Sequence, residues 1–396
     1  MFKELISELK TFINKIIKKI NEATIERNSK ISFKDIFFCA LQMNGRNYTY
    51  SYVNIFLKSK NIIDVSYESL KKKRQNINAD FFKTVNDELL KFIYKDVNKR
   101  IIAADATYIP ISIKFKDYGF HVPENGTYCI ALVSTLFDIE RELIINYNLC
   151  NHHDERLALK GQFSYLNEGD TLIMDRGYYS EELLYELNKM KINVIFRLKI
   201  SYTPVKTMIK SNSDKKNAYS EITYNDTKIK LRVVNYTIND KEYYLGTNIY
   251  DYYFKYFKNL YWGRWKIEIH FKYTKYYLNL QHLQSTNYNC LLQDIYCHQF
   301  IFIINSYFQY RLQQKVKGEM KINNADMLKF INEEFMYYLF YDNFTDNVNN
   351  YLNQFFEMFL KQTIPINPNR EYPRINIGYI TKWKKHNFKV FNKNKK

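Results

Sequence analysis

The stretch YWGRWKIEIHFKYTK, residues 261–275, decides how the rest of the chain is interpreted. It carries Tyr261, Arg264, Glu268 and Lys275. A helix turns by about 100° per residue, so these four side chains fall within an arc of about 60°. One phenol, one guanidinium, one carboxylate and one ammonium group therefore share a face. Such a face suits a metal ion beside a phosphodiester, because the carboxylate ligates the ion and the two cations bind phosphate oxygens.

The opposite side of the same predicted helix is apolar. It carries Trp262, Trp265 and Ile269, with Leu278 beyond them, and we expect this side to pack against a core. The alternative is an ordinary amphipathic helix whose charged side is simply solvated. The spacing alone does not separate the two interpretations, so the decision depends on partners elsewhere in the chain.

The chain is strongly basic. Its 396 residues contain 59 Lys and Arg against 41 Asp and Glu, a formal net charge of +18, which indicates a polyanionic partner. A hydrophobic content of 46% allows sizeable cores in two or three domains. No uncharged apolar run is long enough to span a bilayer, so we expect no membrane partner. The five cysteines form no Cys-x2-Cys pair, which argues against a zinc site.

Residues 1–98 are predicted to form a helical DNA-binding domain. Within it, three short helices at residues 33–42, 48–59 and 66–77 resemble a helix-turn-helix region at about 33–77. A basic third helix suits the DNA major groove, with a cluster on phosphates. The cluster consists of Lys71, Lys72, Lys73 and Arg74. The alternative is a charged surface helix in a dimerisation domain.

From residue 99 the pattern changes to α/β. Apolar runs at 101–105, 127–137, 142–150, 171–174 and 193–198 predict strands, with helices at 154–165 and after Ser180. Three strands, a helix, a strand, a helix and a strand is the order of a ribonuclease H-like mixed sheet. We therefore predict a catalytic domain over residues 99–310, with a β-rich insertion at about 200–250. Residues 311–396 are predicted to be a helical C-terminal region with a basic tail.

Two acids follow neighbouring strands of this predicted sheet. Asp105 and Asp175 both end apolar runs, and Glu268 would come from a helix packed across the same edge. Three carboxylates at one point repel one another unless cations lie between them. Two Mg²⁺ ions about 4 Å apart satisfy this requirement and serve a phosphoryl displacement. The alternative for either aspartate alone is a turn or capping residue at the end of a strand.

These motifs resemble a known family. The runs DATYIPI at 105–111 and MDRGYYS at 174–180, followed by 261–275, resemble DDE transposases of the insertion sequence 4 family. All four positions of its Tyr-x2-Arg-x3-Glu-x6-Lys signature match, and the runs HDE at 153–155 and LQHLQS at 280–285 also resemble the family.

The resemblance implies a DNA transposase that cuts transposon ends and transfers them into target DNA. It implies catalytic, metal-holding roles for Asp105, Asp175 and Glu268, with two Mg²⁺ ions that Mn²⁺ can replace. A homodimer is expected on the paired ends. Arg264 and Lys275 would contact phosphates, and Tyr261 would pack on or hydrogen-bond to the DNA end.

The insertion departs from some relatives, which stack a tryptophan on a base flipped from the cleaved end. This chain has no Trp between Arg176 and Leu260, so a hairpin intermediate is not predicted. Tyrosines of the segment could stack instead: Tyr202, Tyr219, Tyr224, Tyr236, Tyr243 or Tyr244.

Two other functions remain open from the sequence. One is a ribonuclease H-like nuclease without strand transfer, which would use the same three acids. The other is a transposase-derived DNA-binding protein without catalysis. We expect a cytoplasmic, nucleoid-associated protein if the source is bacterial, and a protein of the nucleus or viral factory if the source is a eukaryote or virus.

Overall fold

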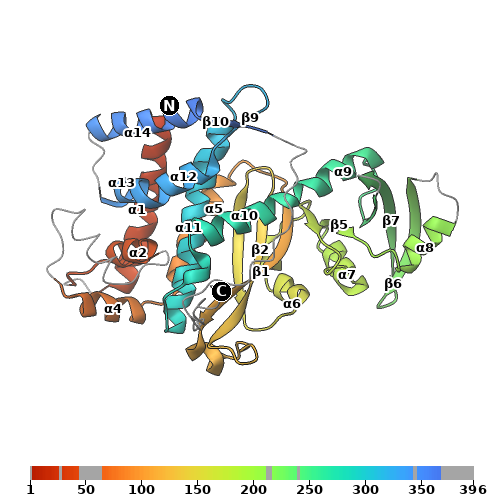
Figure 1. Cartoon of the computed structure of the whole chain (residues 1–396), viewed down its shortest axis with the longest axis horizontal. Helices are drawn as coiled ribbons and strands as arrows, with labels where there is room; N and C mark the ends of the chain where they lie inside the picture. The colour runs from red at the N-terminus through yellow and green to blue at the C-terminus, as the bar shows by residue number, and fades with distance from the viewer. Residues whose placement is uncertain are drawn as a thin grey trace, which may run out of the picture.

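The computed structural model describes residues 2–25, 29–43, 65–210, 216–238, 241–341 and 346–366. A mixed sheet lies at the centre, with a block of helices on one side and the strands of the insertion on the other (Figure 1). This is the α/β architecture that the sequence predicts. The helix predicted at 48–59 lies outside the described residues, as does the tail beyond residue 366.

The main sheet has eight strands in the described part of the chain, in the order β3-β2-β1-β4-β5-β8-β7-β6. Strand β1 pairs antiparallel with β2 and parallel with β4, and β4 pairs parallel with β5. The first five strands therefore have the ribonuclease H-like arrangement. Their bounds are Ile101–Ser112 (β1), Tyr128–Asp138 (β2), Leu143–Cys150 (β3), Thr171–Met174 (β4) and Asn193–Arg197 (β5).

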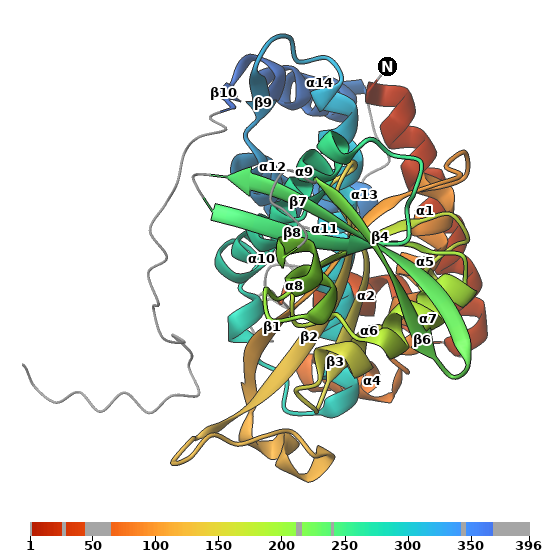
Figure 2. The ribbon, with the colours of Figure 1, turned by 90° about the vertical axis from the view of Figure 1, so that its right-hand side faces the viewer.

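The predicted β-rich insertion extends this sheet. Strand β8 pairs antiparallel with β5, and β7 joins β8 to β6. Figure 2 looks onto this end of the molecule, where the three strands lie nearest the viewer. They follow helix α8, and the four elements are Thr203–Lys210 (α8), Asn217–Tyr224 (β6), Thr227–Ile238 (β7) and Lys241–Thr247 (β8).

Both faces of the central strands are covered, which explains their nearly continuous apolar runs. Successive side chains point to opposite faces. Ala103 and Ile173 therefore join one core, while Ala104 and Met174 join the other. The second core lies under α6 (Glu155–Lys160) and α7 (Glu181–Lys189). Ser180 caps α7 as predicted, whereas Asp154 caps α6, which ends at Lys160, short of the helix predicted to reach residue 165.

The first core is shared by helices from both ends of the chain. Helix α11 (Tyr288–Gln313) runs through it, buried along most of its length, and contacts α5, α2 and β3. The N-terminal helices are Phe2–Thr24 (α1), Phe33–Leu41 (α2), Tyr67–Asn76 (α4) and Asp80–Ile93 (α5). The domain boundaries near residues 98 and 310 stay predictions.

After α11, the chain forms a small helical region whose first and last elements are two short strands that pair antiparallel. Its elements are Met320–Ile322 (β9), Asn324–Phe330 (α12), Met336–Tyr341 (α13), Asp346–Lys361 (α14) and Thr363–Pro365 (β10). Among the described residues, no helix combines the length and apolarity needed to cross a bilayer.

Candidate active site

The two aspartates lie side by side at the sheet edge. Strand β1 pairs with β4 up to Ala104 and Met174, so Asp105 and Asp175 are the next residues on the two parallel strands. The prediction that Asp105 ends its strand was wrong. Strand β1 continues to Ser112, because β2 stays paired with it along that whole length after β4 has ended.

The predicted helix over residues 261–275 forms as two helices, α9 (Phe254–Gly263) and α10 (Trp265–Tyr276), joined at Arg264. Arg264 keeps helical dihedral angles, so the path continues across the junction. Gly263 allows a close approach to the turn between β2 and β3, since a Cβ there would lie 2.6 Å from Cδ1 of Ile139. Lys266 then donates to the carbonyl of Ile139 at 2.9 Å.

The helix buries a different side from the one expected, since Ile267, His270, Phe271 and Thr274 of α10 face the core. Tyr261 and Arg264 are each only 3% exposed. Trp262 and Ile269, predicted to face the core, are 48% and 46% exposed, although Leu278 is buried. Arg264 can be buried because the charges at the sheet edge compensate one another there.

Arg264 bridges two of the three acids. Its Nη1 lies 3.1 Å from Oδ2 of Asp105, and its Nη2 lies 2.9 Å from Oε1 of Glu268. The third acid has different partners: the Tyr261 hydroxyl donates to Oδ1 of Asp175 at 3.2 Å, and Arg197 lies 3.9 Å from the same oxygen. The structure thus brings together the three predicted acids, with a guanidinium between two of them.

Burial changes the proton affinities of this site. It raises the pKa of Asp105 to about 6, against the opposing effects of Arg264 and of the Ala106 backbone N–H. Burial also lowers the pKa of Lys275, on the last turn of α10, to about 8. No ion pair joins Lys275 to any residue that the structure describes.

The donor set fits hard divalent ions, since it consists of carboxylate oxygens without His or Cys. As the side chains stand, no group of three or more His, Cys, Asp or Glu residues in the described ranges is arranged to hold a metal ion. The Arg264 guanidinium lies where a cation between Asp105 and Glu268 would lie. Its own Nε is buried without a hydrogen-bond partner in the described part of the chain.

The family model for the transposase DDE domain matches residues 97–301, which include all three acids and the sheet that positions them. The chain belongs to the DDE transposase family. It is therefore a DNA transposase, an enzyme that binds transposon DNA and cleaves and joins it with divalent metal ions.

Comparison with solved structures finds a piggyBac transposase synaptic complex with hairpin DNA, determined by cryo-electron microscopy. The two chains share 12% identity, and the match covers 88% of this chain and 84% of that one with a TM-score of 0.42. Among curated proteins, none matches this transposase.

A fourth acid lies beside the transposase triad and was not assigned a role from the sequence. Glu155 begins α6, and its Oε2 lies 3.8 Å from the position that a Cβ on Gly177 would take. Burial raises the pKa of Glu155, and the charge of Asp175 adds to the rise. The signal available in the sequence was the HDE run at 153–155, in which Asp154 caps the helix.

The basic cluster on α4 is only partly available for DNA. Lys72 is exposed, Lys73 is half-buried, and Lys71 pairs with Glu68 at 3.6 Å. Arg74 is fully buried, contrary to its predicted phosphate contact. It points from the inner side of α4 into the first core, where it forms an ion pair with Asp294 on α11. A guanidinium held there cannot reach a DNA backbone.

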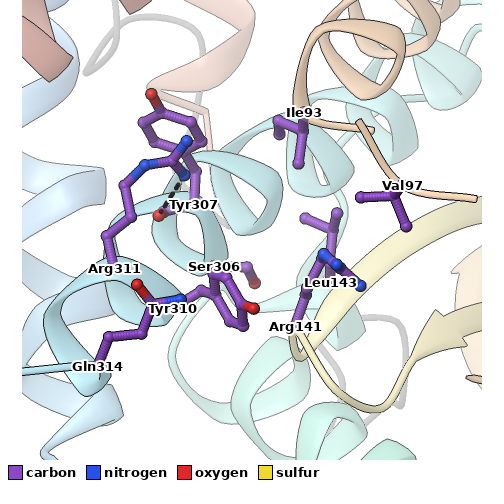
Figure 3. Close-up of a pocket in the computed structure, with 9 residues that line it drawn as sticks. All are labelled: Ile93, Val97, Arg141, Leu143, Ser306, Tyr307, Tyr310, Arg311 and Gln314. Carbon is purple, nitrogen blue, oxygen red and sulfur yellow. Dashed lines mark hydrogen bonds between the residues drawn. The ribbon is translucent and has the colours of Figure 1, made fainter. Parts of the chain in front are cut away.

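Two hollows lie outside the triad of the transposase. One, of about 390 Å³, lies between β7 and the start of α9 and is lined by Lys216, Asn235, Tyr236, Thr237, Phe254, Lys255 and Lys258. The other, of about 230 Å³, lies between α5, the β2–β3 turn and α11, with Arg141 and Tyr310 on its walls (Figure 3).

Of the insertion tyrosines, Tyr236 and Tyr243 stack with ring centroids 5.4 Å apart.

Proposed function

We propose that this transposase cuts the ends of an element of the insertion sequence 4 group and joins them to target DNA, with Asp105, Asp175 and Glu268 as its metal ligands. The convergence of these acids from β1, the end of β4 and α10 is the observation that supports the assignment. Two Mg²⁺ ions, or Mn²⁺ in their place, would supply Lewis-acid chemistry to the attacking and leaving oxygens of a phosphodiester.

The protein's own groups would position the acids and the DNA. Tyr261 holds Asp175 through its hydroxyl, which fixes one carboxylate relative to the helix. Arg264 and Lys275 would bind phosphate oxygens of the end, and Tyr261 would pack beside it. On the N-terminal helices, Lys71, Lys72 and Lys73 would contact phosphates further along the duplex, without Arg74.

We propose a homodimer as the form that pairs two transposon ends, with target DNA as the second DNA partner. The insertion would approach the end through the stacked pair of Tyr236 and Tyr243, of which Tyr236 lines the lysine-rich hollow beside α9. The enzyme would act where its DNA lies: the nucleoid in a bacterium, or the nucleus or viral factory otherwise.

The catalytic assignment is tested by substituting each acid in the full-length protein. Asp105→Ala, Asp175→Ala and Glu268→Ala should each abolish Mg²⁺-dependent or Mn²⁺-dependent cleavage of a duplex carrying the element's end. DNA binding in a gel shift should remain, because the acids do not attract the backbone. Glu168→Gln, an exposed acid paired with Lys191 on the surface, is the matched control.

A Glu268→Ala protein that still cleaves would refute the triad assignment. Joining to target DNA is measured in the same reactions with a precleaved end. Cleavage without joining would favour the nuclease without strand transfer.

A further inference from the structure

Arg264 is buried and paired with two acids, whereas a residue that only binds phosphate would be exposed and unpaired before DNA arrives. Its guanidinium is almost fully buried and forms one ion pair with Asp105 and one with Glu268. The ring centroids of Tyr261 and Trp265 lie 5.7 and 5.4 Å from its Cζ. Without DNA, the cation of the active site is thus part of the protein itself.

The same oxygens cannot serve Arg264 and a divalent ion together. Oδ2 of Asp105 and Oε1 of Glu268 accept hydrogen bonds from the two terminal nitrogens of one guanidinium. Mg²⁺ requires such oxygens at about 2.1 Å in near-octahedral geometry. A guanidinium left in place would also repel the ion, because like charges a few ångströms apart repel strongly where burial limits solvent screening.

We propose that Arg264 acts as a built-in counter-cation that keeps the DNA-free transposase from binding metal at Asp105 and Glu268, and that a phosphate of the DNA end withdraws it. This inference rests on the proposed function of the triad. A phosphate offers the planar guanidinium two oxygens, one for each of the terminal nitrogens that now bond to the carboxylates. Its departure frees both acids for metal at the moment when DNA is in place.

The other cation that pairs with an acid of the triad is Arg197, and its partner is Asp175, while Glu155 adds a further negative charge near Asp105. Arg197 lies 3.9 Å from Asp175, and its Cζ lies 4.8 Å from the ring centroid of Tyr243 in the insertion. Tyr261 gives Asp175 a neutral donor. The counter-cation effect therefore concerns the two acids that Arg264 bridges, Asp105 and Glu268.

Coupling of this kind is reciprocal. If DNA raises the affinity for metal by some factor, metal must raise the affinity for DNA by the same factor. An enzyme so built does not hold active metal ions while it is away from its own end, which protects other DNA from cleavage.

The experiment measures Mn²⁺ binding to the full-length protein by the electron paramagnetic resonance of free Mn²⁺, without DNA and with a saturating duplex of the element's end. Wild-type protein should bind Mn²⁺ weakly without DNA and at least about tenfold more tightly with it, the equivalent of one charge-assisted hydrogen bond. Arg264→Gln should bind Mn²⁺ about tenfold more tightly than wild type without DNA, and its gain on adding DNA should shrink accordingly.

The matched control is Lys266→Gln. Lys266 lies on the same helix and pairs with Glu142 at 3.1 Å, away from the triad. Lys266→Gln removes one positive charge, as Arg264→Gln does. It should nevertheless leave Mn²⁺ binding within about twofold of wild type if the effect of Arg264 is local. Arg264→Met, which keeps the apolar stem, replaces Arg264→Gln if circular dichroism shows that the latter is unfolded.

The outcomes separate the two proposals. If folded Arg264→Gln or Arg264→Met binds Mn²⁺ no more tightly than wild type without DNA, the counter-cation proposal is wrong while the triad stands. If Asp105→Asn with DNA binds as much Mn²⁺ as wild type with DNA, the triad itself is not the metal site.

Discussion

At the scale of single residues, the two cations of the signature differ in their surroundings. Arg264 is neutralised by Asp105 and Glu268. Lys275 is half-buried, has no ion pair in the described ranges, and burial lowers its pKa to about 8. An unpaired ammonium in such a place is stabilised as soon as an anion arrives, because the anion offsets the cost of burying its charge.

The depressed pKa of Lys275 predicts pH-dependent binding of the DNA end. The group is charged below about pH 8 and loses its proton above it, so its contribution to binding is present at pH 7 and declines as pH rises. Affinity should fall by up to about tenfold from pH 7 to pH 9, as one proton is linked to binding. Gel-shift titrations at constant salt would measure this fall.

Lys275→Gln should weaken the complex at pH 7 and remove most of the pH dependence. Lys272→Gln, an exposed neighbour on α10, should keep the wild-type pH dependence. Identical pH profiles for wild type and Lys275→Gln would show that Lys275 does not contact the end.

At the scale of elements, α10 is anchored from beneath by a buried histidine. Nε2 of His270 lies 2.6 Å from the hydroxyl of Tyr147 on β3. The ring packs between Phe137 and Phe302 and is 1% exposed. Because His270 lies two residues after Glu268, this contact helps to fix the position of the acid relative to the sheet. Complete burial lowers the pKa of His270 to about 3.

This buried imidazole predicts a loss of stability in weak acid. The unfolded chain takes up a proton on His270 near pH 6.5, whereas the folded protein does so only near pH 3. Its contribution is therefore complete above pH 6.5 and falls below that by up to about 1.4 kcal/mol per pH unit. Urea unfolding at pH 7.5 and 5.5 should show this difference. In His270→Gln, the difference in unfolding free energy between the two pH values should shrink by the share that one proton contributes. Burial also lowers the pKa of His298, which should account for part of what remains. An unchanged difference would contradict the assignment.

At the scale of the whole molecule, the N-terminal helices and α11 share one core. Phe37 of α2 meets Phe300 of α11 edge to face, with ring centroids 5.1 Å apart. Arg74 and Asp294 form a buried ion pair between α4 and the same helix. We therefore expect the N-terminal region and the catalytic sheet to unfold in a single transition.

The buried pair predicts a large effect from an apparently basic surface residue. Arg74→Gln should lower the free energy of unfolding by about 3 kcal/mol, because it leaves the Asp294 carboxylate without its cation. Lys72→Gln, on the exposed side of α4, should change it by less than about 0.5 kcal/mol. Urea unfolding measures both. Unchanged stability together with weaker DNA binding in Arg74→Gln would restore a phosphate contact for Arg74.

The local pattern of apolar and polar residues was sufficient to predict part of this structure. The order of the first five strands, the cap at Ser180 and the meeting of Asp105 with Asp175 follow from apolar runs and strand adjacency. The rest depends on tertiary partners. Strand β1 is long because β2 follows it, and Arg74 is buried because Asp294, 220 residues away, receives it. The burial of Arg264 depends on ion pairs across the site, which hydrophobic periodicity does not reveal.

The pairing of β8 with β5 has a mechanical consequence. Rows of hydrogen bonds run without interruption from β6 through β7, β8 and β5 to β4, the strand that leads directly into Asp175. The insertion is therefore a continuous part of the main sheet and is not a separate lobe joined by a flexible hinge. A force on the outer strands must therefore either twist the whole sheet or break hydrogen bonds between its strands. Twisting of the sheet would reach the end of β4, where Asp175 lies. Tension in the held DNA would be felt as torsion at the catalytic edge.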